Sequence, residues 1–436
     1  MAFSTFPVEI LAHVFIIGQR MAHYDSQDPY DDEPAPTHPF ELLVSAVNNY
    51  WRHVALGTAL LWCHIESRSP RDKIAAYLAR SESAELHVRL SESEDPETLA
   101  LIMPTSARWA TVSVNALLDN IQGALFNSLR HITTCAQLRR VCTIVEAIEG
   151  AETPALGDKA PPQIFVDPAC APAFVRLRGF ALLVCRPSLV GVVTLHLDLT
   201  RRIRFSYALL RSLLTCSPAL THLSIYGYLE PNQWPPVLTV GRIPLPALRS
   251  LRLKCVLGHS YSELLTRIEA QGLVALALKD VHNDDLDALW PANAVAPVFP
   301  KLERFACVGN EFSDALYPLF MAAFPTVRDF AYIGEAAGCP HLLRHLRPQR
   351  GNWPDLLRVT FLFDEDDSAY TMIDELADWR ELQHRRNLTL RLGTTMDISE
   401  FQSYASEAGI AVEKMVRLDP WPTEGQSDDE EDTLFT

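Results

Sequence analysis

Residues 248–254 read LRSLRLK, in which a leucine precedes two apolar residues separated by one polar residue. This L-x-x-L-x-L motif decides the fold, because it returns throughout residues 193–393. The first member of each apolar pair recurs after 25 to 31 residues, at Leu195, Leu223, Leu251, Leu276, Phe305, Phe330, Val359 and Leu390. The other copies are VTLHLDL (193–199), LTHLSIY (220–226), LVALALK (273–279), KLERFACV (301–308), TVRDFAYI (326–333), LLRVTFL (356–362) and NLTLRLG (387–393).

A motif of this kind with such a period is typical of leucine-rich repeats, in which each repeat adds one strand and one helical segment to a solenoid. Apolar runs with helical spacing lie between the motifs, at residues 262–268, 314–324 and 372–382. We therefore predict an α/β fold, with a leucine-rich-repeat-like solenoid of parallel strands over residues 67–420. Prolines precede several strands, where they end the helix before: Pro218, Pro246, Pro300, Pro325 and Pro354.

The N-terminal limit of the array is less regular. Looser copies of the motif, LHVRL (86–90) and WATVSV (109–114), suggest that the array starts near residue 85. The stretch between residues 120 and 190 is predicted to be irregular. The alternative is a doubly wound α/β domain, which also alternates strands and helices. It is disfavoured because no glycine-rich phosphate loop follows a strand and because the strand motif repeats itself.

Composition places the chain among globular proteins. Of its 436 residues, 48% are hydrophobic and 21% are charged, which excludes global disorder. No stretch reaches the roughly 18 uncharged apolar residues of a membrane-spanning helix. The N-terminus lacks the basic and apolar regions of a secretory signal. We therefore expect an intracellular soluble protein, in the cytoplasm, the nucleus or both, without a membrane partner.

The cysteines predict neither a disulfide framework nor a zinc site. Nine cysteines are scattered without a C-x-x-C pair or a companion histidine spacing. Cys185, Cys255 and Cys307 lie inside apolar runs, where a free thiol behaves as a small buried hydrophobe.

The net charge of −16 is concentrated in two segments. Residues 25–33 hold five acids, residues 424–436 hold six, and neither segment holds a base. We expect the loop at residues 24–39 and the tail at residues 421–436 to be disordered. Overall acidity argues against a nucleic-acid partner, since phosphate-backbone binding needs a basic footprint.

The first 66 residues differ in texture from the repeats. Helical spacing of apolar residues predicts helices at residues 7–20 and 40–56, and a third short apolar run covers residues 60–65. On the first helix, Ile10, Leu11, Val14 and Phe15 are expected on one face. Three short helices bury a marginal core, and a unit of this size often gains stability from a partner.

Residues 6–11 read FPVEIL and resemble the L-P-x-E-I-L opening of F-box domains, with phenylalanine in place of the usual leucine. Residues 47–52 read VNNYWR and resemble the V-C-x-x-W-R core, with Asn48 in place of the common cysteine. Residues 55–62 resemble its A-L-x-x-x-x-L-W close. With the repeats behind it, the chain is similar to mushroom-type fungal F-box proteins with degenerate leucine-rich repeats. Residues 1–66 would then be the F-box, with an unusually long acidic insertion at residues 24–39.

The resemblance implies a function. F-box domains dock on the Skp adaptor of a Skp–cullin–F-box ubiquitin ligase, and the repeats hold a protein substrate. An apolar helical unit suits such docking, because a few apolar anchors carry most of the energy. For Val47 and Trp51 the alternative is a place in the domain's own core, and for the whole chain it is a ligase-independent repeat scaffold. The expected docking residues are Phe6, Pro7, Ile10, Leu11, Val47 and Trp51.

The residues that alternate with the buried apolar pairs predict a substrate surface. Along the eight strands these positions include six bases and two acids, Asp198 and Asp329. We hypothesise that this face receives an acidic or phosphorylated segment, because arginine pairs with carboxylate and phosphate in a bidentate manner. The alternative is a solvated face with local counter-charges. The bases are Arg252, Lys254, Lys279, Arg304, Arg358 and Arg391.

Enzyme motifs are near misses. Residues 258–262 read GHSYS and approach the G-x-S-x-G nucleophile elbow of serine hydrolases, but Ser262 replaces the second glycine. Ser260 is better explained as a helix cap. His341 and His345 have zinc-like spacing without a further ligand, and the acidic run at residues 364–367 lacks the pattern of a calcium loop. We expect a non-enzymatic adaptor without cofactor or metal.

Overall fold

The computed structural model divides the chain into two compact units, one comprising Met1–Val192 with Asp419–Thr436 and one comprising Val193–Leu418. Each is considered by itself. The described residues are 6–25, 39–91, 95–120, 123–132, 134–147, 163–167, 169–203, 207–229, 234–255, 260–279, 281, 299–308, 316–333, 353, 355–362, 389–393, 399–407 and 410–414.

The fold is α/β, with a sheet of 14 strands in chain order. Every strand pairing described is parallel, as predicted. Strands β8 (Ile243–Pro244) and β10 (Ile268–Glu269) form a separate two-stranded sheet. The large sheet contains β1 (His64–Glu66), β2 (Leu86–Ser91), β3 (Trp109–Leu117), β4 (Arg140–Glu146), β5 (Phe174–Gly179), β6 (Thr194–Ile203), β7 (His222–Leu229), β9 (Ser250–Cys255), β11 (Ala275–Lys279), β12 (Arg304–Val308), β13 (Asp329–Ile333), β14 (Arg358–Leu362), β15 (Thr389–Gly393) and β16 (Ala411–Lys414).

A ladder of buried side chains confirms the predicted repeat in the second unit. The eight apolar residues that the motif aligned, from Leu195 to Leu390, are cross-strand partners in unbroken register. Each is at most 1% exposed. Because side chains alternate along a strand, this single register buries one face of every strand and turns the residues between towards the other face.

The first unit carries a second ladder, in Ile65, Val88, Val112, Val141 and Val175. The prediction of an irregular stretch between residues 120 and 190 was wrong, because β4 and β5 lie there. Both strands have the required alternation, but the long interval between Val141 and Val175 breaks the period. The array also begins at β1, earlier than the expected start near residue 85.

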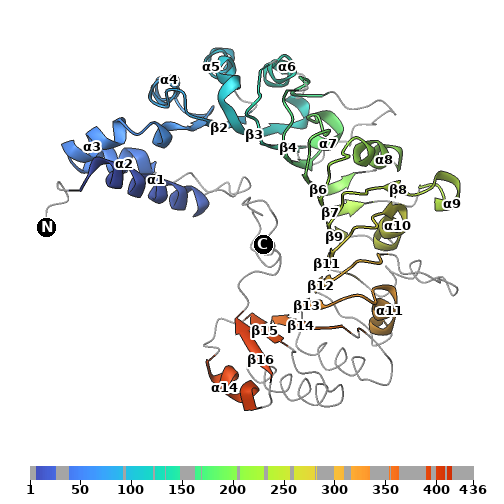
Figure 1. Cartoon of the computed structure of the whole chain (residues 1–436). Helices are drawn as coiled ribbons and strands as arrows, with labels where there is room; N and C mark the ends of the chain where they lie inside the picture. The colour runs from blue at the N-terminus through green and yellow to red at the C-terminus, as the bar shows by residue number, and fades with distance from the viewer. Residues whose placement is uncertain are drawn as a thin grey trace. The chain divides into compact units, whose positions relative to one another are not determined.

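Helices cover one face of the sheet within each unit (Figure 1). In the first unit these are α4 (Arg71–Arg80), α5 (Pro96–Ile102) and α6 (Ala124–Arg130). In the second unit they are α8 (Tyr207–Thr215), α10 (Ser260–Arg267) and α11 (Leu316–Ala323). Most of their buried residues are apolar, for example Leu210, Leu213 and Leu214 of α8. The opposite face of the sheet carries the alternating outward residues. Among the described residues of the repeats, the other helices are α7 (Ala181–Val184), α9 (Val237–Val240) and α14 (Ser399–Glu407), with 3-10 turns η3 (Met103–Arg108) and η4 (Leu118–Asn120).

The N-terminal segment forms helices α1 (Val8–Asp25), α2 (Phe40–Val47) and α3 (Asn49–Leu56) and the 3-10 turn η2 (Ala59–Trp62). The helix predicted over residues 40–56 is broken at Asn48, which has an extended backbone and accepts a 2.8 Å hydrogen bond from the Trp51 amide. Asn48 therefore caps α3, the role that asparagine favours. The last apolar run is a 3-10 turn followed by β1 and not a third helix.

Buried polar contacts join these helices to the first helix of the array. Tyr77 of α4 donates a 2.5 Å hydrogen bond to one carboxylate oxygen of Glu41, and Gln19 of α1 donates to the other at 3.1 Å. The Gln19 amide also donates to the Leu61 carbonyl at 2.8 Å. Burial, together with the hydrogen bond to Glu41, raises the pKa of Tyr77. The phenol therefore stays protonated as a donor. The Glu41 carboxylate therefore links α1, α2 and α4, and the Gln19 amide extends this network to η2.

The cysteines behave as predicted in part. Cys185 and Cys307 are buried free thiols, whereas the side chain of Cys255 lies outside the described residues. Against expectation, Cys135 and Cys170 form a disulfide with Cα atoms 5.0 Å apart. These cysteines precede β4 and β5, which pair in parallel, so the segments that lead into the two strands are neighbours. Because these strands were not predicted, the bridge could not be predicted from the positions of the cysteines in the sequence.

Alkylation of the native protein with iodoacetamide at about pH 8 is expected to modify exposed Cys216 and to spare Cys63, Cys185 and Cys307. Burial raises the pKa of Cys63 to about 11 and that of Cys185 to about 12, and it raises the pKa of Cys307 well above its usual value. Little of the reactive thiolate is therefore present. Peptide mass spectrometry measures the labelling. If Cys185 were modified as fast as Cys216, the burial of Cys185 would be contradicted.

Candidate functional site

Helix α1 presents two apolar stripes, of which only one is covered by the protein. The covered stripe consists of Leu11 and Phe15 and continues in Gln19. The other stripe has the spacing i, i+4, i+7 and i+11, which gathers its side chains within about 60° around the helix axis. Its members are 44–64% exposed: Ile10, Val14, Ile17 and Met21.

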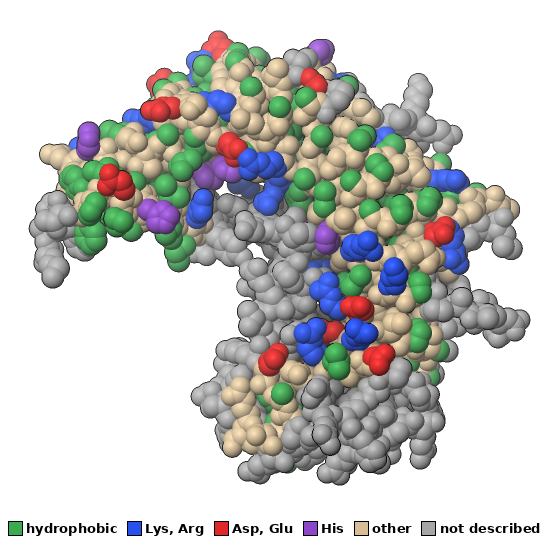
Figure 2. Space-filling model, viewed as in Figure 1, with side chains coloured by type: hydrophobic (Ala, Val, Ile, Leu, Met, Phe, Trp, Pro, Cys, Tyr) green, Lys and Arg blue, Asp and Glu red, His purple; other side chains and the backbone are tan. Residues whose placement is uncertain are grey.

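Further apolar side chains are exposed on the elements that pack against α1. Leu43 and Val47 lie one turn apart on α2 and are 50% and 57% exposed. We define the N-terminal apolar surface as these two residues, the exposed α1 stripe, and Phe6, Val8, Leu42, Leu56 and Leu60. Figure 2 shows hydrophobic side chains over the α1–α3 region. A soluble protein rarely leaves a patch of this kind uncovered unless a partner binds it.

The six predicted docking residues differ in their exposure to solvent. Phe6, Pro7, Ile10 and Val47 are exposed. Leu11 is 4% exposed and belongs to the core, so its inclusion in the docking set is corrected. Trp51 is half-buried, and its ring packs against Phe15 with centroids 5.1 Å apart. Ile10 and Leu11 are neighbours in sequence, and the roughly 100° between successive residues turns them to different faces.

Sequence reasoning missed part of this surface. It placed Val14 on the same face as Leu11, it left Leu43 out of the docking residues, and it did not consider Ile17 or Met21. The spacing from Ile10 to Met21 is itself a helical stripe and was available in the sequence. Two apolar stripes on one helix give no local indication of which one is covered, because that depends on where α2 and α3 pack.

The outward positions of β9–β14 carry the predicted positive charges (Figure 2). Lys254 and Lys279 are cross-strand partners, and Asp329 lies between Arg304 and Arg358 in the register. Arg358 Nη2 lies 2.9 Å from Asp329 Oδ2. We call the five cations Arg252, Lys254, Lys279, Arg304 and Arg358 the basic row.

Accessibility differs along the basic row. Lys254, Arg304 and Arg358 are partly exposed, whereas Arg252 is 2% and Lys279 8% exposed. The two buried cations are therefore largely inaccessible to direct contact with a bound partner. Arg391 lies on β15, and its side chain is outside the described residues.

The first unit has outward arginines that were not predicted, because β4 and β5 were not predicted. Several of them have acidic or aromatic neighbours. Arg178 Nε lies 3.3 Å from Glu146 Oε1, and Arg140 stacks over Phe174 at 5.1 Å from the ring centroid. The motif FVRLRG of β5 contains the same alternation as the recognised repeats and was the available signal.

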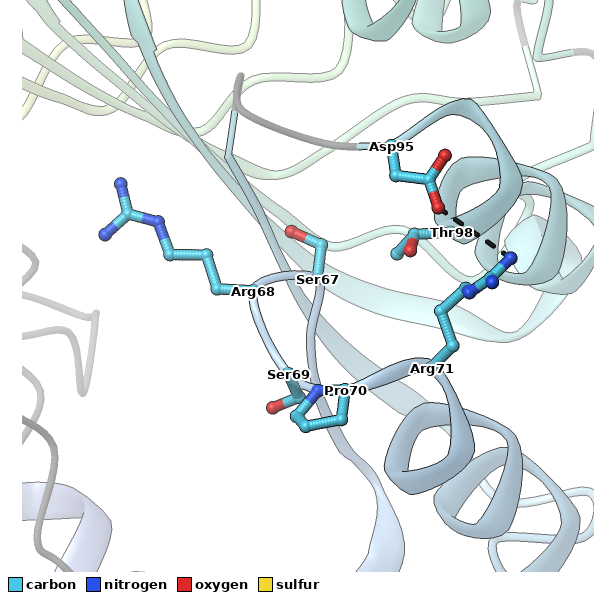
Figure 3. Close-up of a pocket in the computed structure, with 7 residues that line it drawn as sticks. All are labelled: Ser67, Arg68, Ser69, Pro70, Arg71, Asp95 and Thr98. Atoms are coloured by element: carbon cyan, nitrogen blue, oxygen red, sulfur yellow. Dashed lines mark ion pairs between the residues drawn. The ribbon is translucent and has the colours of Figure 1, made fainter.

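A pocket of about 360 Å³ lies where β1 leads into α4 (Figure 3). Arg71 reaches across it towards Asp95 at 3.8 Å and also pairs with Glu97. Ser67 Oγ accepts a 3.1 Å hydrogen bond from the Ser91 amide. The lining offers hydroxyls, guanidinium groups and the Asp95 carboxylate, which lies near Arg71. It consists of Ser67, Arg68, Ser69, Pro70, Arg71, Asp95 and Thr98.

Most residues of the candidate enzyme motifs lie outside the described part of the chain. Helix α10 begins at Ser260, whose side chain lies outside the described residues. Outside them as well lie Gly258, His259, His341, His345, the acidic run at residues 364–367, most of the loop at residues 24–39, and the tail. Within the described ranges, no group of three or more histidine, cysteine or acidic residues could hold a metal ion. No helix there is long and apolar enough to cross a membrane.

Comparison with known protein families and with curated proteins found no match to this chain.

Proposed function

We propose that this chain is the substrate-recognition adaptor of a Skp–cullin–F-box ubiquitin ligase and has no catalytic activity of its own. The N-terminal segment docks on the Skp adaptor, and the repeats hold a protein substrate. The exposed stripe on α1 carries the proposal. It adds to the resemblance of residues 6–11 and 47–62 to F-box motifs, because an apolar helical face left open to solvent fits helix-mediated docking.

The repeats support the second half of the role. A solenoid sheet with helices on one face leaves its other face free to hold an extended partner. Here that face carries the basic row, which suits an acidic or phosphorylated substrate segment. A ligase-independent scaffold would use the same face but would leave the N-terminal apolar surface without a partner.

Co-expression with a Skp adaptor followed by size-exclusion chromatography tests the proposal. We expect the two chains to elute together as a stoichiometric complex, because burying several apolar anchors stabilises such an interface by several kcal/mol. Circular dichroism of the isolated chain serves as the folding control. A well-folded chain that elutes apart from the adaptor would exclude the ligase role and leave the scaffold.

A further inference from the structure

One turn of the first unit combines an accessible serine with a proline directly after it. The sequence contains three serine–proline or threonine–proline pairs: Ser69-Pro70, Thr153-Pro154 and Ser217-Pro218. Ser217 is 1% exposed, and its hydroxyl donates a 3.0 Å hydrogen bond to the Leu213 carbonyl. Thr153 lies outside the described residues. Within the described ranges, Ser69 is therefore the accessible member of this set, partly exposed in the turn between β1 and α4.

Two arginines flank Ser69 in the sequence and line the same pocket (Figure 3). Arg68 is exposed, and its guanidinium has no hydrogen bond or ion pair among the residues that the structure describes. Arg71 lies 3.8 Å from Asp95, the acid of the lining, and its side chain is 52% exposed. An exposed pair of this kind is weak, so a stronger anion can replace Asp95 as the partner of Arg71.

The start of α4 follows Ser69 directly and favours a negative charge there. Its N-cap residue is Pro70, and no side chain forms a capping hydrogen bond. The first-turn amides therefore lack the side-chain acceptor that commonly binds them, and the helix dipole adds to their attraction for an anion. Asp72 is the acid already present in this turn. A phosphoryl group on Ser69 would lie next to these amides and between the two arginines in sequence.

A buried hydroxyl is an independent indication of a polar ligand in this pocket. Thr98 of α5 is 4% exposed and lines the pocket, and its side chain makes no hydrogen bond within the described part of the chain. Hydroxyls buried to this extent usually have a partner. The pocket has a volume of about 360 Å³, which leaves room for a phosphoryl group with its three acceptor oxygens. The Thr98 hydroxyl is an available donor for one of them.

We propose that Ser69 is a phosphorylation site for a proline-directed serine/threonine kinase and that the pocket between β1 and α4 holds the phosphoryl group. In the reaction, Ser69 Oγ forms a bond to the γ-phosphorus of ATP, the bond from that phosphorus to ADP breaks, and the hydroxyl proton is released. Pro70 favours this serine because proline imposes an extended conformation on the residue before it, as a kinase substrate groove requires. Arg68, the first-turn amides and Arg71 then bind the phosphoryl oxygens.

The first measurement is phosphorylation of the full-length chain by cyclin-dependent and mitogen-activated kinases, which are proline-directed. Peptide mass spectrometry is expected to show Ser69 modified at least about tenfold faster than Ser217, because the buried serine reacts only after local unfolding. Ser217-Pro218 is thus a matched control within the same protein. Equal rates at the two serines, or no modification of Ser69 by either kinase class, would overturn the proposed site.

The second measurement tests whether the pocket holds the phosphoryl group. Phosphoserine is incorporated at position 69 during synthesis of the full chain, so that no kinase is needed, and ³¹P NMR follows the second ionisation of the phosphate. In a phosphopeptide of residues 64–75 the pKa of that ionisation should be about 6. In the folded chain, guanidinium groups and helix amides favour the dianion, so the midpoint is expected at least about 0.5 pH unit lower.

Variants of the phosphorylated chain assign the contacts. Arg68→Ala is expected to move the midpoint back towards that of the peptide, and Thr98→Val should do so to a smaller extent. The matched control is Arg20→Ala, which removes an equally exposed cation of the same unit outside the pocket and should leave the midpoint unchanged. Circular dichroism checks folding. A midpoint equal to that of the peptide, or equal midpoints for Arg68→Ala and Arg20→Ala, would show that the pocket does not bind the phosphoryl group. These outcomes are independent of Skp binding.

Discussion

The double variant Ile10→Asp/Val14→Asp is expected to elute without the Skp adaptor under conditions in which the native chain elutes with it. The two side chains are 52% and 53% exposed, so the isolated protein has little to lose from the change. In the complex, each aspartate would be buried unpaired in an apolar interface. Losing two anchors at about 2 kcal/mol or more each weakens binding roughly 1,000-fold.

The control places the same charge change on exposed apolar residues outside the N-terminal apolar surface. Leu101 on α5 and Val190 are 39% and 64% exposed, and Leu101→Asp/Val190→Asp should retain the adaptor. Both variants should match the native far-ultraviolet circular dichroism. Retention of the adaptor by both variants would remove the α1 stripe from the interface. Leu11→Asp cannot serve here, because it would place a charge in the core.

Trp62→Ala is expected to lower the free energy of unfolding of the first unit by about 3–5 kcal/mol. Trp62 is fully buried, its indole N–H donates a 3.0 Å hydrogen bond to the Ala55 carbonyl, and its ring meets Tyr77 edge to face at 5.0 Å. The Arg80 guanidinium covers the ring at 4.4 Å from the centroid. The substitution removes the contact between η2 and α4 and leaves a cavity beneath the N-terminal helices.

Thermal unfolding monitored by circular dichroism measures this loss. For a unit of this size we expect a fall in melting temperature of about 6–20 °C. Leu60→Ala is the matched control, since Leu60 lies in the same 3-10 turn and is 51% exposed. It should cost less than about 1 kcal/mol. Hydrogen exchange should quicken in α1–α4 of the tryptophan variant alone. Equal melting temperatures for the two variants would show that η2 does not anchor the helices.

The repeat could be predicted because its signal is local and repeated. Within the motif at residues 248–254, alternation alone assigns Leu251 and Leu253 to one face and Arg252 to the other. The period then aligns each strand with the next, and the observed register between Leu251 and Leu276 follows that alignment. Strands β4 and β5 have the same alternation. The spacing between them is longer than the period of the other repeats, so the period could not be used to align them.

The N-terminal segment was predictable only as helices. The sequence by itself determined that α1 is an apolar-faced helix, since its periodicity depends on residues within one or two turns. It did not predict that Asn48 breaks the helix over residues 40–56. Tertiary structure decided that Leu11 is covered and Ile10 is not, that Glu41 joins Gln19 to Tyr77, and that two cysteines meet before β4 and β5. Each of these depends on which distant segments pack together, and short-range spacing carries no information about such contacts.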